Sequence, residues 1–203
     1  SAVAHSNLGN ILRYFGKFQD AELSTRKAIE LNPNSAKAHS NLGSILSGLG
    51  KFEDAEISTR KAIDLKPDYA DAHSNLGCIL RDLGKFQDAE ISTRKAIELN
   101  PDSSVAHSNL GNILRYMGKF EDAEISIRKA IDLKPDFADA HYILGGILND
   151  IGNLKVAEIS TRKAIDLKPD YADAHSNLGS ILCGLGELKA AEISTRKAID
   201  LKP

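Results

Sequence analysis

Residues 36–67 read AKAHSNLGSILSGLGKFEDAEISTRKAIDLKP, and this stretch decides the fold. In its first half the apolar residues recur at steps of one, three and four, which is the pattern of one helix stripe. Gly50 and Lys51 interrupt the pattern, and a second apolar stripe begins at Phe52. Pro67 cannot continue that second helix, because its ring blocks the preceding turn. The stretch therefore predicts two helices over 36–50 and 51–67, and Asp68 is expected to cap the next helix.

The same pattern recurs every 34 residues along the whole chain. Histidine marks the step in the first half of each unit, and proline marks it at the end of the second half. The histidines are His5, His39, His73, His107, His141 and His175, and the prolines are Pro33, Pro67, Pro101, Pro135, Pro169 and Pro203. The chain is therefore predicted to be a single array over 1–203, with repeats at about 2–35, 36–69, 70–103, 104–137, 138–171 and 172–203. One hairpin cannot bury its own stripe, so neighbouring hairpins must stack.

Composition excludes several classes of protein. The formal net charge of −2 argues against a nucleic-acid partner. No apolar run is long enough to cross a membrane, so no membrane partner is predicted. The two cysteines form no spaced framework and no signal peptide is visible, which together predict a reduced, cytoplasmic protein.

The recurring register of small and apolar residues resembles the tetratricopeptide repeat (TPR) family. The resemblance rests on the period of 34 and on Leu42-Gly43, Ala55, Ala62 and Pro67, and it recurs in all six units. This chain departs from the family at the position of its usual Trp, where His39 and its equivalents stand. Its large aromatic in the second helix is also replaced, by Thr in most units. The resemblance implies an all-α, right-handed superhelix whose first helices line a concave groove that holds peptides or proteins.

The groove face of the first helices carries one asparagine in five of the six units. These residues are Asn7, Asn41, Asn75, Asn109 and Asn177, here called the asparagine ladder, and Ile143 stands in the fifth unit. The string AHSNLG resembles the TPR arrays of O-linked N-acetylglucosamine transferases, whose concave asparagines bind the backbone of an extended peptide. An amide offers two donors and one acceptor group, which match the C=O and N–H of a peptide unit. Alternatively, the asparagines bond across adjacent first helices and only stiffen the stack.

Other positions of the groove face vary between units and are expected to read the ligand's side chains. They are Asn10 and Asn112 at one position and Arg13, Arg81 and Arg115 at another. In the fifth unit Tyr142 and Ile143 replace the usual Ser-Asn pair, which predicts a pocket for one apolar side chain of the ligand. Duplication followed by drift would give the same variation, and that alternative stays open.

Catalytic machinery, metal ligands and cofactor motifs are not predicted. Each repeat has one histidine, about 10 Å from the next by helix stacking, which is too far for two of them to share an ion. The histidines lie on the apolar stripe and are expected to pack in the core. The carboxylates mostly form i,i+4 pairs with arginine, such as Glu56 with Arg60, which support a helix rather than a reaction.

The two ends of the array are expected to expose apolar side chains. Leu8 and Ile11 have no preceding repeat, and Ile193 and Ile199 have no following one. Terminal repeats without polar faces threaten solubility, so we expect homo-oligomers through these ends, or a natural protein that continues beyond them. The leading function is a scaffold that binds an extended peptide or protein segment. The alternatives are a substrate-docking module of a larger enzyme and a self-assembling structural repeat.

Overall fold

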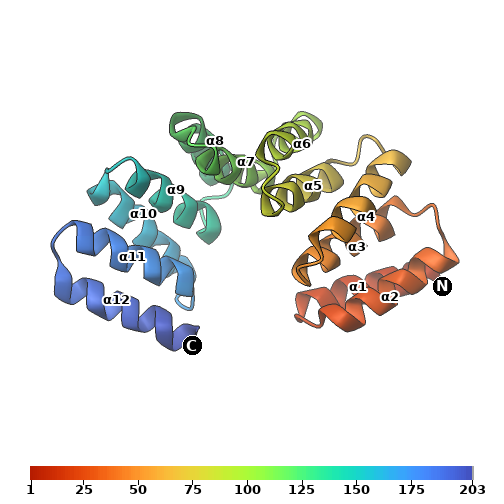
Figure 1. Ribbon diagram of the computed structural model, residues 1–203, viewed down its shortest axis with the longest axis horizontal. Coiled ribbons are helices and arrows are strands. Elements are labelled where there is room, and N and C mark those ends of the chain that lie inside the picture. Colours follow the sequence, from red (N-terminus) through yellow and green to blue (C-terminus); the bar gives the residue numbers. More distant parts are fainter. Residues whose placement is uncertain (203) are drawn as a thin grey trace. The chain divides into compact units, whose positions relative to one another are not determined.

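The computed structural model describes residues 1–202, and in that range it consists of twelve α-helices and no strand. The helices pair into six hairpins, one for each predicted repeat (Figure 1). They are α1 (Ala2–Tyr14), α2 (Phe18–Leu31), α3 (Ala36–Gly48), α4 (Phe52–Leu65), α5 (Ala70–Asp82), α6 (Phe86–Leu99), α7 (Ser104–Tyr116), α8 (Phe120–Leu133), α9 (Ala138–Asp150), α10 (Leu154–Leu167), α11 (Ala172–Gly184) and α12 (Leu188–Leu201). The predicted all-α architecture of six helix-turn-helix repeats is confirmed.

The chain divides into two compact units of three hairpins, Ser1–Pro101 and Asp102–Pro203. Within each unit the second helix of one hairpin packs on the first helix of the next, as α2 does on α3 and α10 on α11. The boundary between the units falls at the predicted junction between the third and fourth repeats. That the chain forms a single array over its whole length stays a prediction.

The turn inside each hairpin needs a residue with positive φ. In the second hairpin this is Gly50, with φ of +73°, just after α3. This conformation brings the backbone N–H of Lys51 to the carbonyl of Leu46 at 2.9 Å, which satisfies a carbonyl at the helix end. The residue before α5 is Tyr69, with no side-chain capping bond, so the prediction that Asp68 caps this helix is wrong.

A close helix crossing holds each hairpin together. Gly43 of α3 faces Thr59 of α4, which is fully buried and donates its hydroxyl to the carbonyl of Ala55 at 2.8 Å. A methyl group on Gly43 would overlap the Thr59 hydroxyl, so only glycine permits this approach. Thr59 stands at the position where the TPR family usually has a large aromatic residue. Its smaller side chain fills the space beside Gly43. The core of each unit is then completed by Leu and Ile side chains of the first helices, such as Ile45 and Leu46.

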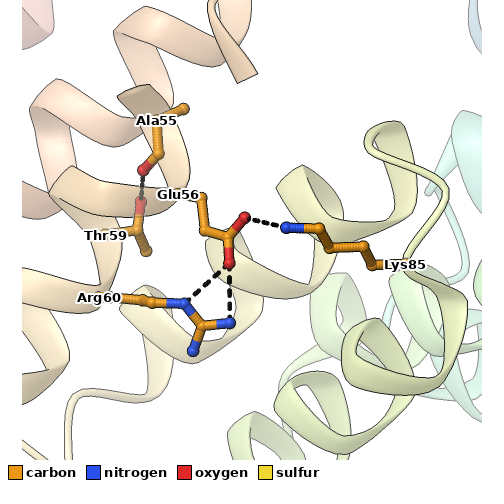
Figure 2. Close-up of polar contacts among 5 residues, drawn as sticks. All are labelled: Ala55, Glu56, Thr59, Arg60 and Lys85. Carbon is orange, nitrogen blue, oxygen red and sulfur yellow. Dashed lines mark hydrogen bonds and ion pairs between the residues drawn. The ribbon is translucent and has the colours of Figure 1, made fainter. Parts of the chain in front are cut away.

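Ion pairs join consecutive hairpins in the first unit. Figure 2 shows Glu56 of α4 between Arg60 of its own helix and Lys85, which precedes α6 in the next repeat. The Glu56 carboxylate lies 2.8 Å from the Arg60 guanidinium and 2.7 Å from the Lys85 ammonium. Glu22 makes the same pairs with Arg26 and Lys51. In the second unit the first hairpin keeps a lysine, Lys119, at this position, but the next two hairpins hold Asn153 and Glu187, so Glu124 and Glu158 have no lysine at the position that pairs with Glu56.

Candidate peptide-binding face

The first helices form the inner face of each unit. Their backbones come close to one another between consecutive repeats, from α1 to α3 to α5 and from α7 to α9 to α11. Within either unit, the second helices of consecutive repeats do not approach one another in this way. A stack that is tighter on one side curves toward that side, so each unit is concave along its first helices. We call this side the inner face.

The asparagine ladder of the first unit is anchored from the preceding repeat. Asn41 of α3 donates its Nδ2 hydrogen to the Ser6 hydroxyl of α1, at 3.2 Å. Asn75 of α5 donates in the same way to Ser40 of α3, also at 3.2 Å. The two asparagines are partly buried, whereas their serine acceptors are buried between the helices. These are the bonds across adjacent first helices that the alternative interpretation predicts, and they fix how each amide is turned.

Tyr69 adds a second contact to the Asn75 anchor. The Ser40 hydroxyl that accepts from Asn75 also shares a hydrogen bond with the Tyr69 hydroxyl. Burial raises the pKa of Tyr69, and the nearby carboxylate of Asp71 raises it further. The bond with Ser40 acts in the opposite direction but does not outweigh these effects, so the pKa of Tyr69 is raised and the tyrosine stays neutral at physiological pH. Sequence reasoning placed Ser40 beside the ladder but not as its anchor, and it missed Tyr69.

The ladder is altered in the second unit. Asn177 of α11 donates to Thr161 of α10 at 3.4 Å, toward the second helix of the preceding repeat. The serine that anchors Asn41 and Asn75 has no counterpart here, because Tyr142 occupies its position in α9. Asn109 is partly buried at the matching position of α7. Asn7, at the matching position of α1, is exposed.

The arginines of the inner face contact acceptors on the same surface. Arg13 donates to the Oδ1 atom of Asn10 at 3.2 and 3.3 Å, and its guanidinium lies 4.5 Å from the centre of the Tyr14 ring. Arg81 pairs with its neighbour Asp82 at 2.6 Å. Arg115 of α7 reaches the next repeat and pairs with Asp150 of α9, also at 2.6 Å. Gly146 makes room for this reach, since a methyl group there would overlap the Arg115 guanidinium. Asn112 is partly buried on the same helix as Arg115.

Tyr142 and Ile143 differ in what they offer a ligand. Only 8% of Ile143 is exposed, so little of its surface is accessible. Tyr142 is partly exposed and packs against Tyr171, with the ring centres 5.1 Å apart and the planes tilted by 46°. Burial raises the pKa of both hydroxyls, and for Tyr171 the nearby Asp139 carboxylate, to which it hydrogen-bonds, adds to this effect.

The histidines do not lie in the core as expected. His39 is partly exposed, and its Nε2 atom lies 2.9 Å from the carbonyl oxygen of Pro33, six residues earlier. Because a carbonyl can only accept, the ring donates through Nε2 and ties the loop between repeats to the next helix. His73, His141 and His175 make the same bond. Residues 1–202 contain no group of three or more His, Cys, Asp and Glu side chains that could hold a metal ion.

The second helices carry a separate set of hollows that the helical pattern did not indicate. One of about 430 Å³ lies between α2 and α4, with Ile29, Leu42 and Ile57 among its lining residues. Two equivalent hollows lie in the second unit.

No helix among the described residues is long and apolar enough to span a membrane.

Models of the tetratricopeptide repeat match most of the sequence. The matched residues are 2–35 and 70–103, 25–57, 108–172, and 172–203, each by a model of that description. The chain belongs to the tetratricopeptide repeat family. The resemblance drawn from Leu42-Gly43, Ala55, Ala62 and Pro67 is thereby confirmed. None of the curated protein sequences matches this TPR chain.

Solved TPR structures share the fold. A chain of the APC/C hetero-tetramer Cut9-Hcn1 superposes with a TM-score of 0.92 at 16% identity, covering 100% of this chain and 40% of that one. TTC0263, a thermophilic TPR protein of Thermus thermophilus, gives a TM-score of 0.80 at 21% identity, covering 90% and 100%. YrrB, described as a TPR protein with an unusual peptide-binding site, gives 0.61 at 24% identity, covering 88% and 92%.

Proposed function

We propose that this TPR chain is a protein-interaction scaffold that binds an extended peptide along the inner face of its first helices. The observation that carries the proposal is the anchored orientation of Asn41 and Asn75. Each amide uses one Nδ2 hydrogen to bond a serine of the preceding repeat. A side chain held in one orientation loses less conformational entropy when a ligand binds, so its remaining polar groups bind more tightly.

The anchors leave the groups that a peptide backbone needs. After its bond to serine, each asparagine amide keeps one N–H and the carbonyl Oδ1. These can bond one C=O and one N–H of a ligand. The bond to serine and the bonds to a ligand therefore use different atoms, so stiffening the stack and binding a peptide are compatible roles for the same residue.

The spacing of the ladder suits an extended chain. Stacked helices advance about 10 Å per repeat, and an extended peptide rises about 3.3 Å per residue. One asparagine therefore meets every third residue of the ligand, whatever its side chain. Each bond contributes only about 0.5–1.5 kcal/mol net, so we expect an affinity that is roughly micromolar.

Ligand side chains would meet the variable positions beside the ladder. We propose that ligand side chains contact Asn10 and Arg13 in the first repeat. In the second unit they contact Asn112, Arg115 and Tyr142. The pairs that Arg13, Arg81 and Arg115 already make reduce their net attraction for an acidic ligand. This favours recognition of the backbone over recognition of charge.

The comparisons support a binding role rather than a catalytic one. The match to TPR models supports protein–protein interaction in general, and the similar YrrB structure is described as having a peptide-binding site. We propose that the chain itself is no enzyme, whether it acts alone or as the docking module of one. The free thiols of Cys78 and Cys183 support a reducing, cytoplasmic location.

A peptide array tests the proposal. Peptides selected on an array of 12-residue sequences are titrated by calorimetry into the wild-type chain, the Asn41→Ala/Asn75→Ala variant and an Asn34→Ala control. Asn34 lies in the exposed loop before α3 and has the same side chain, but it is not on the inner face. Counting one ligand bond for each amide, loss of both ladder amides should weaken binding about 5- to 150-fold, the equivalent of about 1–3 kcal/mol.

Two results would contradict this proposal. One is an unchanged affinity in a double variant whose circular dichroism shows an intact fold. The other is equally tight binding of polyproline, which adopts an extended form but has no backbone N–H to donate.

A further inference from the structure

Two adjacent residues of α9 interrupt the bonding pattern of the asparagine ladder. In the first unit each anchored asparagine bonds a serine that stands 35 residues earlier, as Asn41 does with Ser6. In the second unit the same register joins position 143 to Ser108, and it joins Asn177 to position 142. Position 143 is an isoleucine, which has no amide, and position 142 is a tyrosine in place of the serine acceptor. The pair Tyr142-Ile143, here called the ladder break, therefore changes two consecutive rungs.

The first of these rungs has lost its polar group. Ile143 is 8% exposed, and Ser108 on the neighbouring first helix is 3% exposed. An isoleucine side chain neither donates nor accepts a hydrogen bond, so it cannot bind the backbone of a ligand as an asparagine can. This rung therefore offers a peptide no amide.

The second rung is held toward a second helix. Asn177 donates its Nδ2 hydrogen to the hydroxyl of Thr161, a fully buried residue of α10, at 3.4 Å. The ladder bonds of Asn41 and Asn75 measure 3.2 Å and end on serines of first helices. A longer hydrogen bond is a weaker one, so a serine-type acceptor at position 142 would compete with Thr161 for the Asn177 amide.

Tyr142 supplies a different kind of surface. Its ring packs against Tyr171, with the ring centres 5.1 Å apart and the planes tilted by 46°, and both side chains are partly exposed. The Tyr171 hydroxyl bonds the Asp139 carboxylate, and the Lys168 ammonium lies 4.5 Å from the centre of the Tyr171 ring. These contacts hold Tyr171 in place, so Tyr142 rests on a fixed neighbour.

A fixed and partly exposed aromatic pair favours contact with a large apolar side chain. Ring faces and ring edges carry opposite partial charges, which also favours tilted or offset packing of a further aromatic ring. The charged groups near Tyr142 already have partners. Asp173 lies 3.8 Å from the Lys202 ammonium. Arg115 pairs with Asp150. The apolar surface of the aromatic pair is therefore what this site offers a ligand.

We propose that the ladder break is a specificity site, at which Tyr142 selects a large apolar side chain of the ligand, aromatic by preference. The anchored amides of the first unit bind a peptide backbone whatever its sequence. The ladder break, which has no anchored amide, then decides which sequences bind. The inference rests on the proposed peptide-binding function and adds a sequence preference to it.

Calorimetry with substituted peptides tests the proposal. A peptide selected on the array is changed to alanine at each position in turn. One position should hold a large apolar residue, and alanine there should weaken binding to the wild-type chain about tenfold or more, as expected when the burial of such a side chain is lost. Tyr142→Ser/Ile143→Asn should remove most of that penalty. This variant is expected to fold, because the other five repeats have the Ser-Asn pair at these positions.

The same exchange should extend backbone recognition into the second unit. It supplies an amide at position 143 and a hydroxyl that can accept from Asn177. The peptide with alanine at the selective position should then bind the exchanged chain about 5- to 150-fold more tightly than it binds the wild type, counting one bond for each of two amides. The Nδ2 resonances of Asn177 should also shift in the exchanged chain without ligand, because the amide changes its acceptor.

Tyr142→Phe is the matched control, since it keeps the ring and removes only the hydroxyl. It should retain the preference of the wild type. The proposal is overturned if no side-chain preference of the peptide depends on Tyr142, if the preferred side chain is charged, or if Tyr142→Phe loses the preference as fully as the exchange does.

Failure of this inference can be told apart from failure of the proposed function. If Asn41→Ala/Asn75→Ala weakens binding but the exchange at 142–143 leaves the alanine penalty unchanged, the ladder binds the peptide and the ladder break is not its specificity site. If Asn41→Ala/Asn75→Ala has no effect, the proposed function is contradicted and this inference falls with it.

Discussion

The crossing of α3 and α4 makes the stability of the second repeat depend on the absence of one methyl group. In Gly43→Ala the new Cβ overlaps the Thr59 hydroxyl and lies 3.2 Å from the backbone carbonyl oxygen of Ala55. Forcing an extra carbon into a packed core costs about 1–3 kcal/mol. Turning the hydroxyl away from Ala55 leaves it buried and unsatisfied, at a further cost of about 1–3 kcal/mol. The higher helix propensity of alanine offsets about 1 kcal/mol of these two costs.

The variant should therefore unfold more easily by about 3 kcal/mol, within a range of about 1–5 kcal/mol. Urea unfolding followed by circular dichroism measures this, fitted with a nearest-neighbour model because a repeat array need not unfold in one step. In a Thr59→Ala background the same change should be nearly neutral, and Gly146→Ala should cost less because it meets only the movable end of Arg115. If Gly43→Ala stabilises the wild-type chain, or costs as much in the Thr59→Ala background as in the wild type, the reasoning about this crossing is refuted.

Two further predictions concern the ion pairs between repeats. The hydrogen bond from Lys85 lowers the pKa of Glu56 despite the opposing effect of burial, so this pair stabilises the fold at neutral pH and the contribution is lost as pH falls below about 4.3. Lys85→Met should flatten that part of the curve of urea midpoint against pH, and an unchanged curve would contradict the assignment. In the second unit, Asn153→Lys should place an ammonium beside Glu124 and add about 0.2–1 kcal/mol. The gain should disappear in a Glu124→Gln background, and a gain that persists there has another source.

The fold was predictable because one pattern is repeated six times. The 34-residue step of histidine and proline, and the glycine at Gly43 and its equivalents, each carry the same information in every unit. Helix limits follow from Gly50 and Pro67, since one requires a positive φ and the other cannot continue a helix. The capping residue was not predictable in this way, because Asp68 and Tyr69 are adjacent and only the path of the loop decides between them.

The wrong expectations concern side chains whose surroundings come from a neighbouring repeat. His39 lies at the edge of the apolar stripe, but its ring nitrogen bonds the Pro33 carbonyl of the preceding loop, which a helical wheel does not contain. Ile193 is exposed as expected, at 70%, but its equivalent Ile57 in an interior repeat is 68% exposed, so a place on the outer side of the second helix accounts for it. A wheel drawn for one helix identifies a face, but it does not show which neighbour covers that face.

The site was predictable as a row of residues but not in its detailed contacts. The register of Asn41 and Asn75 follows directly from the repeat. Their anchors depend on serines 35 residues earlier in the chain. The turn of Asn177 toward Thr161 follows from one substitution, Tyr142 for serine, in another repeat. Sequence comparison between the repeats revealed that substitution, but only the packed helices reveal its effect on Asn177.

The most direct test of the asparagine ladder is an NMR titration that follows the side-chain amides themselves. The ¹⁵N-labelled chain is titrated with a peptide selected on the 12-residue array, and the Nδ2 resonances of Asn41, Asn75 and Asn34 are assigned by single substitution. We predict that the resonances of Asn41 and Asn75 shift together and saturate at the affinity measured by calorimetry, while Asn34 does not respond. Saturable binding that leaves the two ladder amides unmoved would contradict the account.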